Sequence, residues 1–342
     1  MSDTILVTGG AGYVGSHCCK LLAAAGYTPV VYDNFSSGHL DFVKWGPLVE
    51  GDIRNVSALS QAISFYRPIA VMHFAALSLV GQSVLEPADY WDVNVNGVRT
   101  LLEAMRNNAC DKIVFSSTCA VYGDPDTLPI SEETPIAPLS PYGMSKHAAE
   151  MMMQSYDRAY GIRSARLRYF NACGGDPDGE IGERHDPETH LIPLVLGAVS
   201  GQRGPVTVFG RDYPTRDGTA IRDYIHVNDL ALAHLAAISY LQNGHDSLAV
   251  NLGTGMGHSV ADIIAAVERV TGQSVPFHDA PRRDGDPACL VASPQLAAEL
   301  LGWRPIDSDL DQVIADAWHW HCSGKQTSAP HRNLNLELVD SE

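Results

Sequence analysis

A glycine-rich turn between an apolar run and a helical pattern constrains the fold of this chain most. The apolar run is Thr4–Val7, and the turn that follows has G-x-x-G-x-x-G spacing at Gly9, Gly12 and Gly15. Apolar positions from 14 to 25 then recur at helical intervals. In a strand–turn–helix unit, glycines let the backbone approach a pyrophosphate, and the helix N-terminus faces its charge. This order favours a dinucleotide-binding unit, with the three glycines at the cofactor, over an ordinary glycine turn.

A second apolar run, Val30–Asp33, ends in an acidic residue. Asp33 lies about 20 residues beyond the glycines, where dinucleotide-binding units carry a carboxylate. A carboxylate there accepts hydrogen bonds from both hydroxyls of the adenosine ribose and repels a 2'-phosphate. Its position favours this role over that of a solvated strand-end acid, so we expect the cofactor to be NAD rather than NADP.

Strand-like runs alternate with helical patterns through the first half of the chain. Further strands are expected at Leu48–Ile53, Ile69–Phe74, Lys112–Ser117 and Ser164–Phe170, and long helices at Asp89–Asn107 and Tyr142–Tyr160. This alternation predicts an α/β fold with a doubly wound parallel sheet of the Rossmann type. Ligands of such sheets bind beyond the carboxyl ends of the strands. The candidate residues at such ends are Asp33, Asp52, Phe74, Ala75, Ala76, Thr118 and Asn171.

The candidate catalytic groups lie between Ser117 and Lys146. Thr118 follows an apolar strand, and Tyr142 and Lys146 are four residues apart at a helix start, on one helix face. An ammonium beside a phenol favours the phenolate, so Lys146 is expected to lower the pKa of Tyr142 and make it a usable base. Thr118 would share the proton with Tyr142. Y-x-x-x-K alone is also typical of a solvated helix surface, and the other motifs favour the catalytic interpretation.

The pattern changes after residue 170, where a loop rich in Gly, Asp and Glu leads into shorter elements. We expect an NAD-binding domain over residues 1–172, completed by parts of 220–255. A smaller α+β substrate lobe would cover 173–322, followed by a polar tail over 323–342.

The second half also supplies arginines that an acidic protein needs to bind an anionic substrate. Arg222 and either Arg282 or Arg283 have planar donor groups that suit phosphate oxygens. Ion pairs with Asp223 and Asp284 are an equally good interpretation from the sequence.

Composition limits the partners of the chain. Its 342 residues carry a net charge of −17, which argues against nucleic-acid binding. We expect no signal peptide and no membrane span. The seven cysteines lack C-x-x-C spacing, so reduced thiols in the cytoplasm are the simplest interpretation. The segment Asp176–Gly179 lacks a further acidic ligand of a calcium loop and is interpreted as a turn, so no metal site is expected.

A set of motifs runs in order from residue 4 to about 320. They are T-G-G-x-G-x-x-G, D-N after the second strand, F-S-S-T-x-x-V-Y-G, P-Y-G-x-S-K, R-Y-F-N, R-D-Y-I-H-V and P-R-R-x-G-D. Together they resemble the UDP-glucose (UDP-galactose) 4-epimerase family, which belongs to the extended short-chain dehydrogenase/reductases. The resemblance implies tightly held NAD and a UDP-hexose substrate. Tyr142 and Thr118 would move the proton of the sugar 4-hydroxyl, and Lys146 would hold the nicotinamide ribose.

The same resemblance implies two sets of binding residues. The cofactor set comprises Tyr13, Val14, Asp33, Asn34, Asp52, Ile53, Phe74, Ala75, Ala76, Asn94, Tyr142, Lys146 and Tyr169, besides the glycines. The substrate set comprises Thr118, Asn171, His190, Leu191, Phe209, Arg222, Arg283, Asp286 and Cys289. Two positions depart from the family pattern: Ser78 stands where some members carry Lys, and His190 stands where others carry Asn.

In this family, the position of Cys289 limits the size of the group at the sugar 2-position. A small residue there predicts activity on UDP-GlcNAc and UDP-GalNAc as well. The alternative is that Cys289 is only a small core residue and that neighbouring loops close the pocket.

Other functions remain open at this stage. Another UDP-sugar 4-epimerase, acting on a pentose or uronate, and a nucleotide-sugar dehydrogenase would share these motifs. A 4,6-dehydratase would carry an acidic pair after the Thr, where this chain has Cys119 and Ala120. A non-enzymatic NAD-sensing protein has no need of Thr118, Tyr142 and Lys146. The resemblance also implies a homodimer formed by the two long helices.

Overall fold

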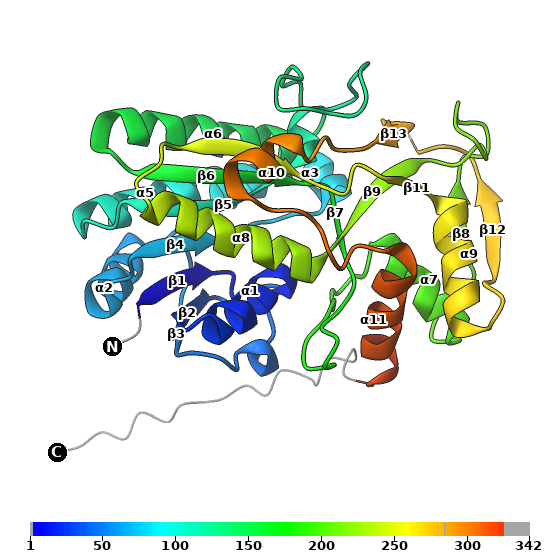
Figure 1. The fold of residues 1–342 in the computed structure, drawn as a ribbon, viewed down its shortest axis with the longest axis horizontal. Helices are drawn as coiled ribbons and strands as arrows, with labels where there is room; N and C mark the ends of the chain where they lie inside the picture. The colour runs from blue at the N-terminus through cyan, green and yellow to red at the C-terminus, as the bar shows by residue number, and fades with distance from the viewer. Residues whose placement is uncertain (1–2, 284, 325–342) are drawn as a thin grey trace.

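The computed structural model describes residues 3–283 and 285–324 and is built around a seven-stranded parallel sheet (Figure 1). The strand order is β10-β6-β5-β4-β1-β2-β3. The strands are β1 (Thr4–Thr8), β2 (Thr28–Asp33), β3 (Leu48–Glu50), β4 (Ala70–His73), β5 (Lys112–Thr118), β6 (Arg163–Tyr169) and β10 (Leu248–Leu252). The chain moves outward from β1 to β3 and then from β4 to β10 in the opposite direction, so a crevice opens between the carboxyl ends of β1 and β4. The predicted doubly wound fold is confirmed.

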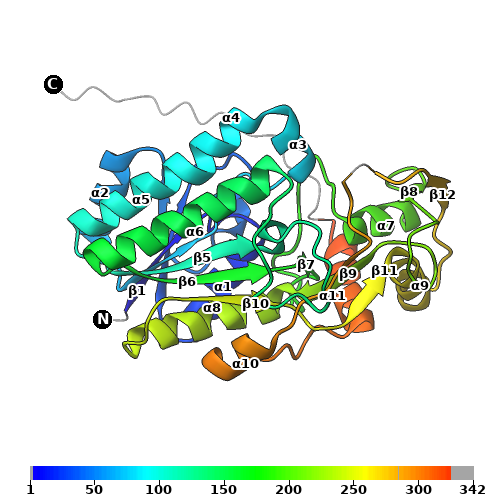
Figure 2. The same cartoon turned by 90° about the horizontal axis from the view of Figure 1, so that it is seen from above.

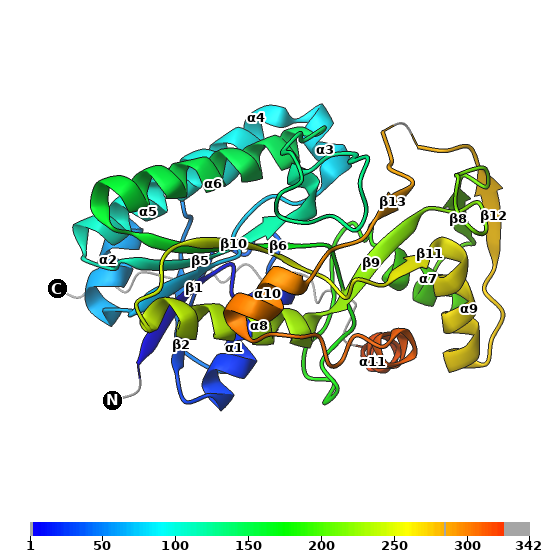
Figure 3. The same cartoon turned by 45° about the horizontal axis from the view of Figure 1, so that its top comes forward.

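Helices cover both faces of this sheet (Figures 2 and 3). One face carries α1 (Tyr13–Ala24) and α8 (Val227–Gln242), and the other carries α2 (Val56–Tyr66), α5 (Gly97–Asn107) and α6 (Pro141–Tyr160). Each face has its own apolar core. The strands read as nearly continuous apolar runs because both of their faces are buried.

The two long predicted helices differ in detail from the expectation. Helix α6 begins at Pro141, because the hydroxyl of Ser140 accepts a hydrogen bond from the Gly143 amide at 3.2 Å and caps the helix. The expected helix over Asp89–Asn107 begins earlier, at α4 (Pro87–Tyr90), and passes through a π-helical turn at Trp91–Asn96 before α5. A short helix, α3 (Val80–Leu85), precedes it.

The second lobe packs helices against short strands around a separate core. Its elements are α7 (Leu191–Val199), β8 (Val206–Phe209), α9 (Val260–Thr271), β12 (Phe277–Ala280) and α11 (Leu310–Cys322). A small sheet of β7 (Asn171–Cys173), β9 (Ile221–His226), β11 (Gly257–Ser259) and β13 (Cys289–Leu290) lies between this lobe and the large sheet (Figure 3). The remaining helical segments are α10 (Gln295–Leu301) and 3-10 turns at Leu40–Phe42 and Cys119–Val121.

Elements from late in the chain complete the large sheet and one of its helical layers. Strand β10 pairs with β6, and α8 packs against α1. The expected tail lies almost wholly outside the described residues, which end at Gly324. Among the described helices, none is long and apolar enough to cross a membrane.

Candidate active site

The glycine turn packs too closely for side chains. A Cβ on Gly9, whose φ is +74°, would lie 2.5 Å from the Ala75 amide nitrogen, and one on Gly15 would lie 2.2 Å from the Gly9 carbonyl oxygen. The turn therefore brings β1, α1 and the segment after β4 into direct contact. Gly12 is the N-cap of α1 and offers no side chain to cap it. The first N–H groups of α1 thus suit an anion such as a pyrophosphate.

Asp33 lies at the carboxyl end of β2, beside this turn, and is mostly buried. Its carboxylate oxygens accept hydrogen bonds from the Ala11 amide at 3.0 Å and the Phe35 amide at 2.9 Å. Burial raises the pKa of Asp33, and these two amides oppose that rise. The amides hold the carboxylate in place at the strand end, which is the geometry expected for a group that accepts ribose hydroxyls.

A second acidic group lies next along the sheet edge. Asp52 accepts a hydrogen bond from Asn34 at 3.0 Å and a two-fold contact from Arg54, at 2.9 and 2.7 Å. Hydrogen bonding to Arg54 lowers the pKa of Asp52 to about 2. Sequence reasoning missed Arg54, although it lies only two residues after Asp52. Ile53 is buried beside them.

Other predicted cofactor residues are held by contacts within the protein. The side chain of Asn94 accepts a hydrogen bond from the Leu77 amide at 2.8 Å and donates to the Leu77 carbonyl and the Ser145 hydroxyl, at 2.9 and 3.0 Å. The hydroxyl of Tyr169 is hydrogen-bonded to that of Ser116. Tyr13 donates to the Gly174 carbonyl at 2.8 Å. These contacts fix the walls of the crevice between β1 and β4.

The predicted catalytic tyrosine and threonine meet at the end of β5. The Thr118 hydroxyl accepts from the Ala120 amide at 3.1 Å and lies near enough to the Tyr142 phenol to affect its pKa. Burial raises the pKa of Tyr142 to about 12, and the nearby Thr118 hydroxyl opposes that rise. The expectation that Lys146 lowers the pKa of Tyr142 is therefore wrong for the chain by itself. The loss of solvation outweighs the attraction that a helix-neighbour argument predicts.

Lys146 is buried, and its ammonium nitrogen donates to the Ser116 carbonyl at 2.9 Å while lying 4.8 Å from the centre of the Phe115 ring. Burial lowers the pKa of Lys146 to about 7, and the negative charge of Glu150 opposes this. Near neutral pH the side chain is thus poised between its charged and neutral forms.

Because burial lowers the pKa of Lys146 to about 7, folding stability should depend on pH through this residue. The folded-state pKa of about 7 lies below the ordinary value of 10.5, so between these values the folded chain binds fewer protons than the unfolded chain. The free energy of unfolding should therefore rise with pH over that window, by about 1.4 kcal/mol per pH unit from this group. Urea unfolding gives the free energy of unfolding of wild type and of Lys146→Met. We expect the difference, wild type minus variant, to increase from pH 7 to pH 9. A pH-independent difference would contradict the depressed pKa.

A buried charge network supports these residues, and sequence reasoning missed it. Glu150, one turn after Lys146, accepts from Arg168 at 2.9 and 2.5 Å and from the Ser117 hydroxyl at 2.5 Å. Arg168 also donates to the Tyr122 hydroxyl at 2.9 Å. The network joins α6 to the ends of β5 and β6, which carry the catalytic candidates. The only signal in the sequence was an acid and an arginine inside otherwise apolar patterns.

The predicted substrate residues of the second lobe also come together. Asp286 pairs with Arg222 and, at 2.7 Å, with Arg283, whose guanidinium lies 5.2 Å from the centre of the Phe209 ring. The alternative interpretation, in which Arg222 forms an ion pair with Asp223, is wrong, because Arg222 pairs with Asp286. Asp223 is buried and instead accepts hydrogen bonds from backbone amides, including that of Thr254 at 2.8 Å. Asp284 lies outside the described residues.

The remaining substrate candidates lie at the boundary of the two lobes. Asn171 begins β7, Leu191 begins α7, and Cys289 is half-buried on β13 opposite Ile221 of β9. His190 precedes α7 and joins Glu183, His185 and Glu188 in one cluster of donor atoms. The spacing E-x-H-x-x-E-x-H was visible in the sequence and was overlooked.

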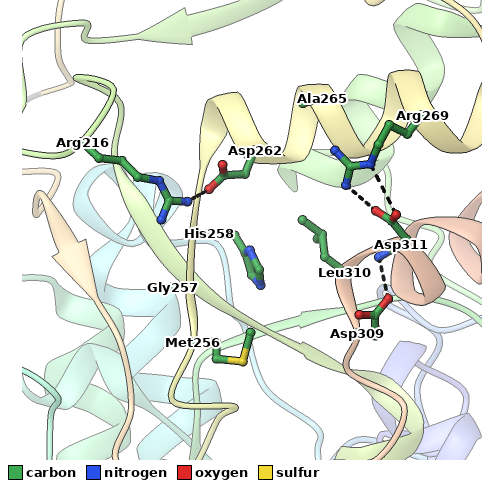
Figure 4. Close-up of a pocket in the computed structure, with 10 residues that line it drawn as sticks. All are labelled: Arg216, Met256, Gly257, His258, Asp262, Ala265, Arg269, Asp309, Leu310 and Asp311. Atoms are coloured by element: carbon green, nitrogen blue, oxygen red, sulfur yellow. Dashed lines mark hydrogen bonds and ion pairs between the residues drawn. The ribbon is translucent and has the colours of Figure 1, made fainter.

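An open pocket of about 540 Å³ lies elsewhere, between β11, α9 and the start of α11 (Figure 4). Ion pairs join Arg216 to Asp262 and Arg269 to Asp311 at its walls. Its lining contains none of the residues predicted from the sequence, so we do not assign the active site to it.

The chain belongs to the NAD dependent epimerase/dehydratase family, whose model matches residues 5–253. It is 50% identical over 325 residues to the UDP-glucose 4-epimerase of Rhizobium meliloti (strain 1021), covering 95% of this chain and 99% of that relative. It is similar to the crystal structure of UDP-glucose 4-epimerase from Brucella ovis in complex with NAD, with a TM-score of 0.92, 51% identity and coverage of 93% of this chain and 98% of that one. It is also similar to the crystal structure of UDP-glucose 4-epimerase from Bifidobacterium longum in complex with NAD+ and UDP. The TM-score is 0.89 and the identity is 35%, with coverage of 95% of this chain and 99% of that one.

Proposed function

We propose that this protein is an NAD-dependent UDP-glucose 4-epimerase, which interconverts UDP-glucose and UDP-galactose through a 4-keto sugar. The observation that carries the proposal is the position of Thr118, at the end of β5, beside Tyr142, at the start of α6, in a chain about half identical to such enzymes over almost its full length. The tightly packed glycine turn, the uncapped N-terminus of α1 and the anchored Asp33 fit the dinucleotide.

When bound, NAD+ would accept a hydride from C4 of the sugar and return it to the opposite face. The chain itself handles the proton: the phenolic oxygen of Tyr142 takes it from the 4-hydroxyl and gives it back to the 4-keto oxygen. Thr118 orients the phenol and stabilises its ionised form by a hydrogen bond. Lys146 would bind the nicotinamide ribose. Proton transfer of this kind typically contributes about 10²–10⁴-fold to a rate.

For the substrate, we propose that Arg222, Arg283 and Phe209 bind the UDP moiety. The two arginines share Asp286, so the carboxylate holds both guanidinium groups in one place. Arginine donors suit phosphate oxygens, and the ring of Phe209 offers an apolar surface. Asn171 and Leu191 would complete this subsite from β7 and from the start of α7.

Dehydration is a poor alternative for this site. Thr118 is followed by Cys119 and Ala120, neither of which carries a carboxylate. A dehydratase needs an acid and a base to remove water after oxidation.

The proposal that this protein is a UDP-glucose 4-epimerase is tested by incubating the purified protein with UDP-galactose and no added reductant. We expect UDP-glucose without accumulation of NADH; a stoichiometric build-up of NADH and keto sugar would instead indicate a dehydrogenase.

We also propose that the pocket accepts N-acetylated sugars. Cys289 is small and lies on β13 next to Leu290, which pairs with Arg222 of β9. Replacing Cys289 by Tyr should lower kcat/KM for UDP-GalNAc by about tenfold or more, because an overfilled pocket costs a few kcal/mol. Activity on UDP-galactose should change far less. Product analysis with both sugars tests this, with Cys289→Ser as the control of equal size; no wild-type turnover of UDP-GalNAc would contradict it.

A homodimer is proposed through the two long helical segments, residues 87–107 and α6, which lie side by side (Figure 2). Apolar side chains are exposed on both, among them Trp91 and Met151. Light scattering at micromolar concentration should give twice the monomer mass. Met151→Glu should shift the mass toward the monomer, whereas Phe65→Glu, at an exposed apolar position on α2, should not. A monomeric wild type would refute the proposal.

We propose that residues 1–172 act as the NAD-binding domain, completed by α8 and β10, and that 173–322 bind the substrate. The separate apolar cores of the two regions support this division.

We further propose that the protein works in a reducing compartment, the cytoplasm. All seven cysteines lie within the described residues, and each is free.

A further inference from the structure

Two histidines and two glutamates converge in the loop that leads from β7 to α7. They are Glu183, His185, Glu188 and His190, and one donor atom from each lies within 4.8 Å of all the others. Glu183 is buried, His185 and Glu188 are half-buried, and His190 is exposed. The cluster lies beside the start of α1, because the ring of His185 lies 6.2 Å from that of Tyr13, edge to face.

Two of the distances in the cluster match those between the ligands of a small metal ion. His185 Nδ1 lies 3.4 Å from Glu183 Oε1 and 3.5 Å from Glu188 Oε2. Tetrahedral ligands at about 2.0–2.1 Å from Zn²⁺ lie about 3.3–3.4 Å from each other. His190 Nδ1 is closer to Glu183 Oε1 because the two are hydrogen-bonded.

The backbone and the second carboxylate oxygen are already held in place. Glu188 Oε1 accepts from the Thr189 and His190 amides at 2.8 and 2.9 Å, which leaves Oε2 directed at His185. The Glu183 carbonyl accepts from the Trp320 indole at 2.9 Å, and the Arg184 carbonyl is bonded to His39 at 2.9 Å. Such outer contacts fix ligand orientation in metal sites.

The chemistry of the donors favours one class of cation. Imidazole nitrogens with carboxylates suit Zn²⁺ and its neighbours in the first transition row, whereas all-oxygen sites suit Mg²⁺ and Ca²⁺. A nearby all-oxygen group behaves differently: Asp176, Asp178 and Glu180 surround the ammonium of Lys20 at 2.8, 2.7 and 2.8 Å. That group already holds a cation from the protein itself.

We propose that Glu183, His185, Glu188 and His190 bind one Zn²⁺ ion with four protein ligands. Because all four positions are filled by side chains, the ion is structural and does not activate water. It ties the segment before α7 into a closed loop and so fixes the start of that helix, where Leu191 lies. The earlier expectation that the chain has no metal site is replaced by this proposal.

The test is metal binding to the full-length protein, with its cofactor as purified, after treatment with a chelator. Equilibrium dialysis against Zn²⁺ should give one tightly bound ion per chain. Co²⁺ in its place should show the visible absorption of a tetrahedral site. His185→Gln and Glu188→Gln should each weaken Zn²⁺ binding more than tenfold. Both variants are measured so that the test still stands if one of them does not fold.

Matched controls separate this site from adventitious binding. His278→Gln removes an exposed histidine elsewhere, and Cys322→Ser removes an exposed thiol. Neither should change the affinity. Binding of less than one ion per chain, equal affinity in His185→Gln and wild type, or loss of binding in Cys322→Ser would each overturn the proposal. Because the readout is bound metal, the result is independent of whether the protein epimerises UDP-galactose.

Discussion

Replacing Tyr142 by phenylalanine should lower kcat for UDP-galactose by about 10²–10⁴-fold or more, the range for loss of a positioned acid–base group. Only the phenolic hydroxyl is removed, and with it the influence of Thr118 on that group. Binding of UDP should change little, because Tyr142 lies at the start of α6 while the arginines lie in the second lobe. Steady-state kinetics with calorimetric titration of UDP separates the two effects.

Tyr156→Phe is the matched control for this experiment. It removes a phenol from the same helix, where the hydroxyl donates to Glu103 at 2.5 Å. We expect kcat to stay within about threefold of wild type, since surface changes away from a site usually have small effects. A Tyr142→Phe enzyme that retains more than a tenth of wild-type kcat would show that another group moves the proton.

Removing the charge of Arg168 should cost about 3–5 kcal/mol of folding stability. Glu150 is fully buried, and hydrogen bonding to Arg168 lowers its pKa, against the effect of burial. Arg168→Met would leave the carboxylate without a cation in a site that water does not reach. Urea unfolding of the variant should therefore show a much lower midpoint than that of wild type.

Two further variants make this prediction specific. The double change Arg168→Met with Glu150→Leu should recover much of the loss, because an apolar pair of similar volume has no unpaired charge. Arg211→Met breaks an exposed pair with Asp279 and should cost less than about 1 kcal/mol. Equal losses in Arg168→Met and Arg211→Met would mean that the buried pair contributes no more than a surface pair.

Local patterns predicted most of the elements well. The strands expected at Lys112–Ser117 and Ser164–Phe170 and the helix expected at Tyr142–Tyr160 each lie within one residue of the expected bounds. The third strand is shorter than expected and ends at Glu50. Gly51, which follows it, lies against the ring of Tyr32, where a Cβ would meet the hydroxyl at 2.4 Å. No local pattern contains that contact.

The sequence by itself determined the glycine turn, the alternation of strands and helices, and the placing of Thr118, Tyr142 and Lys146 at element ends. These features follow from periodicity and spacing, which are local properties of the chain. Only the tertiary structure decided that β10 pairs with β6, that Glu150 pairs with Arg168, and that burial raises the pKa of Tyr142 and lowers that of Lys146. Strand order and desolvation depend on contacts between residues far apart in the chain, and no local pattern encodes them.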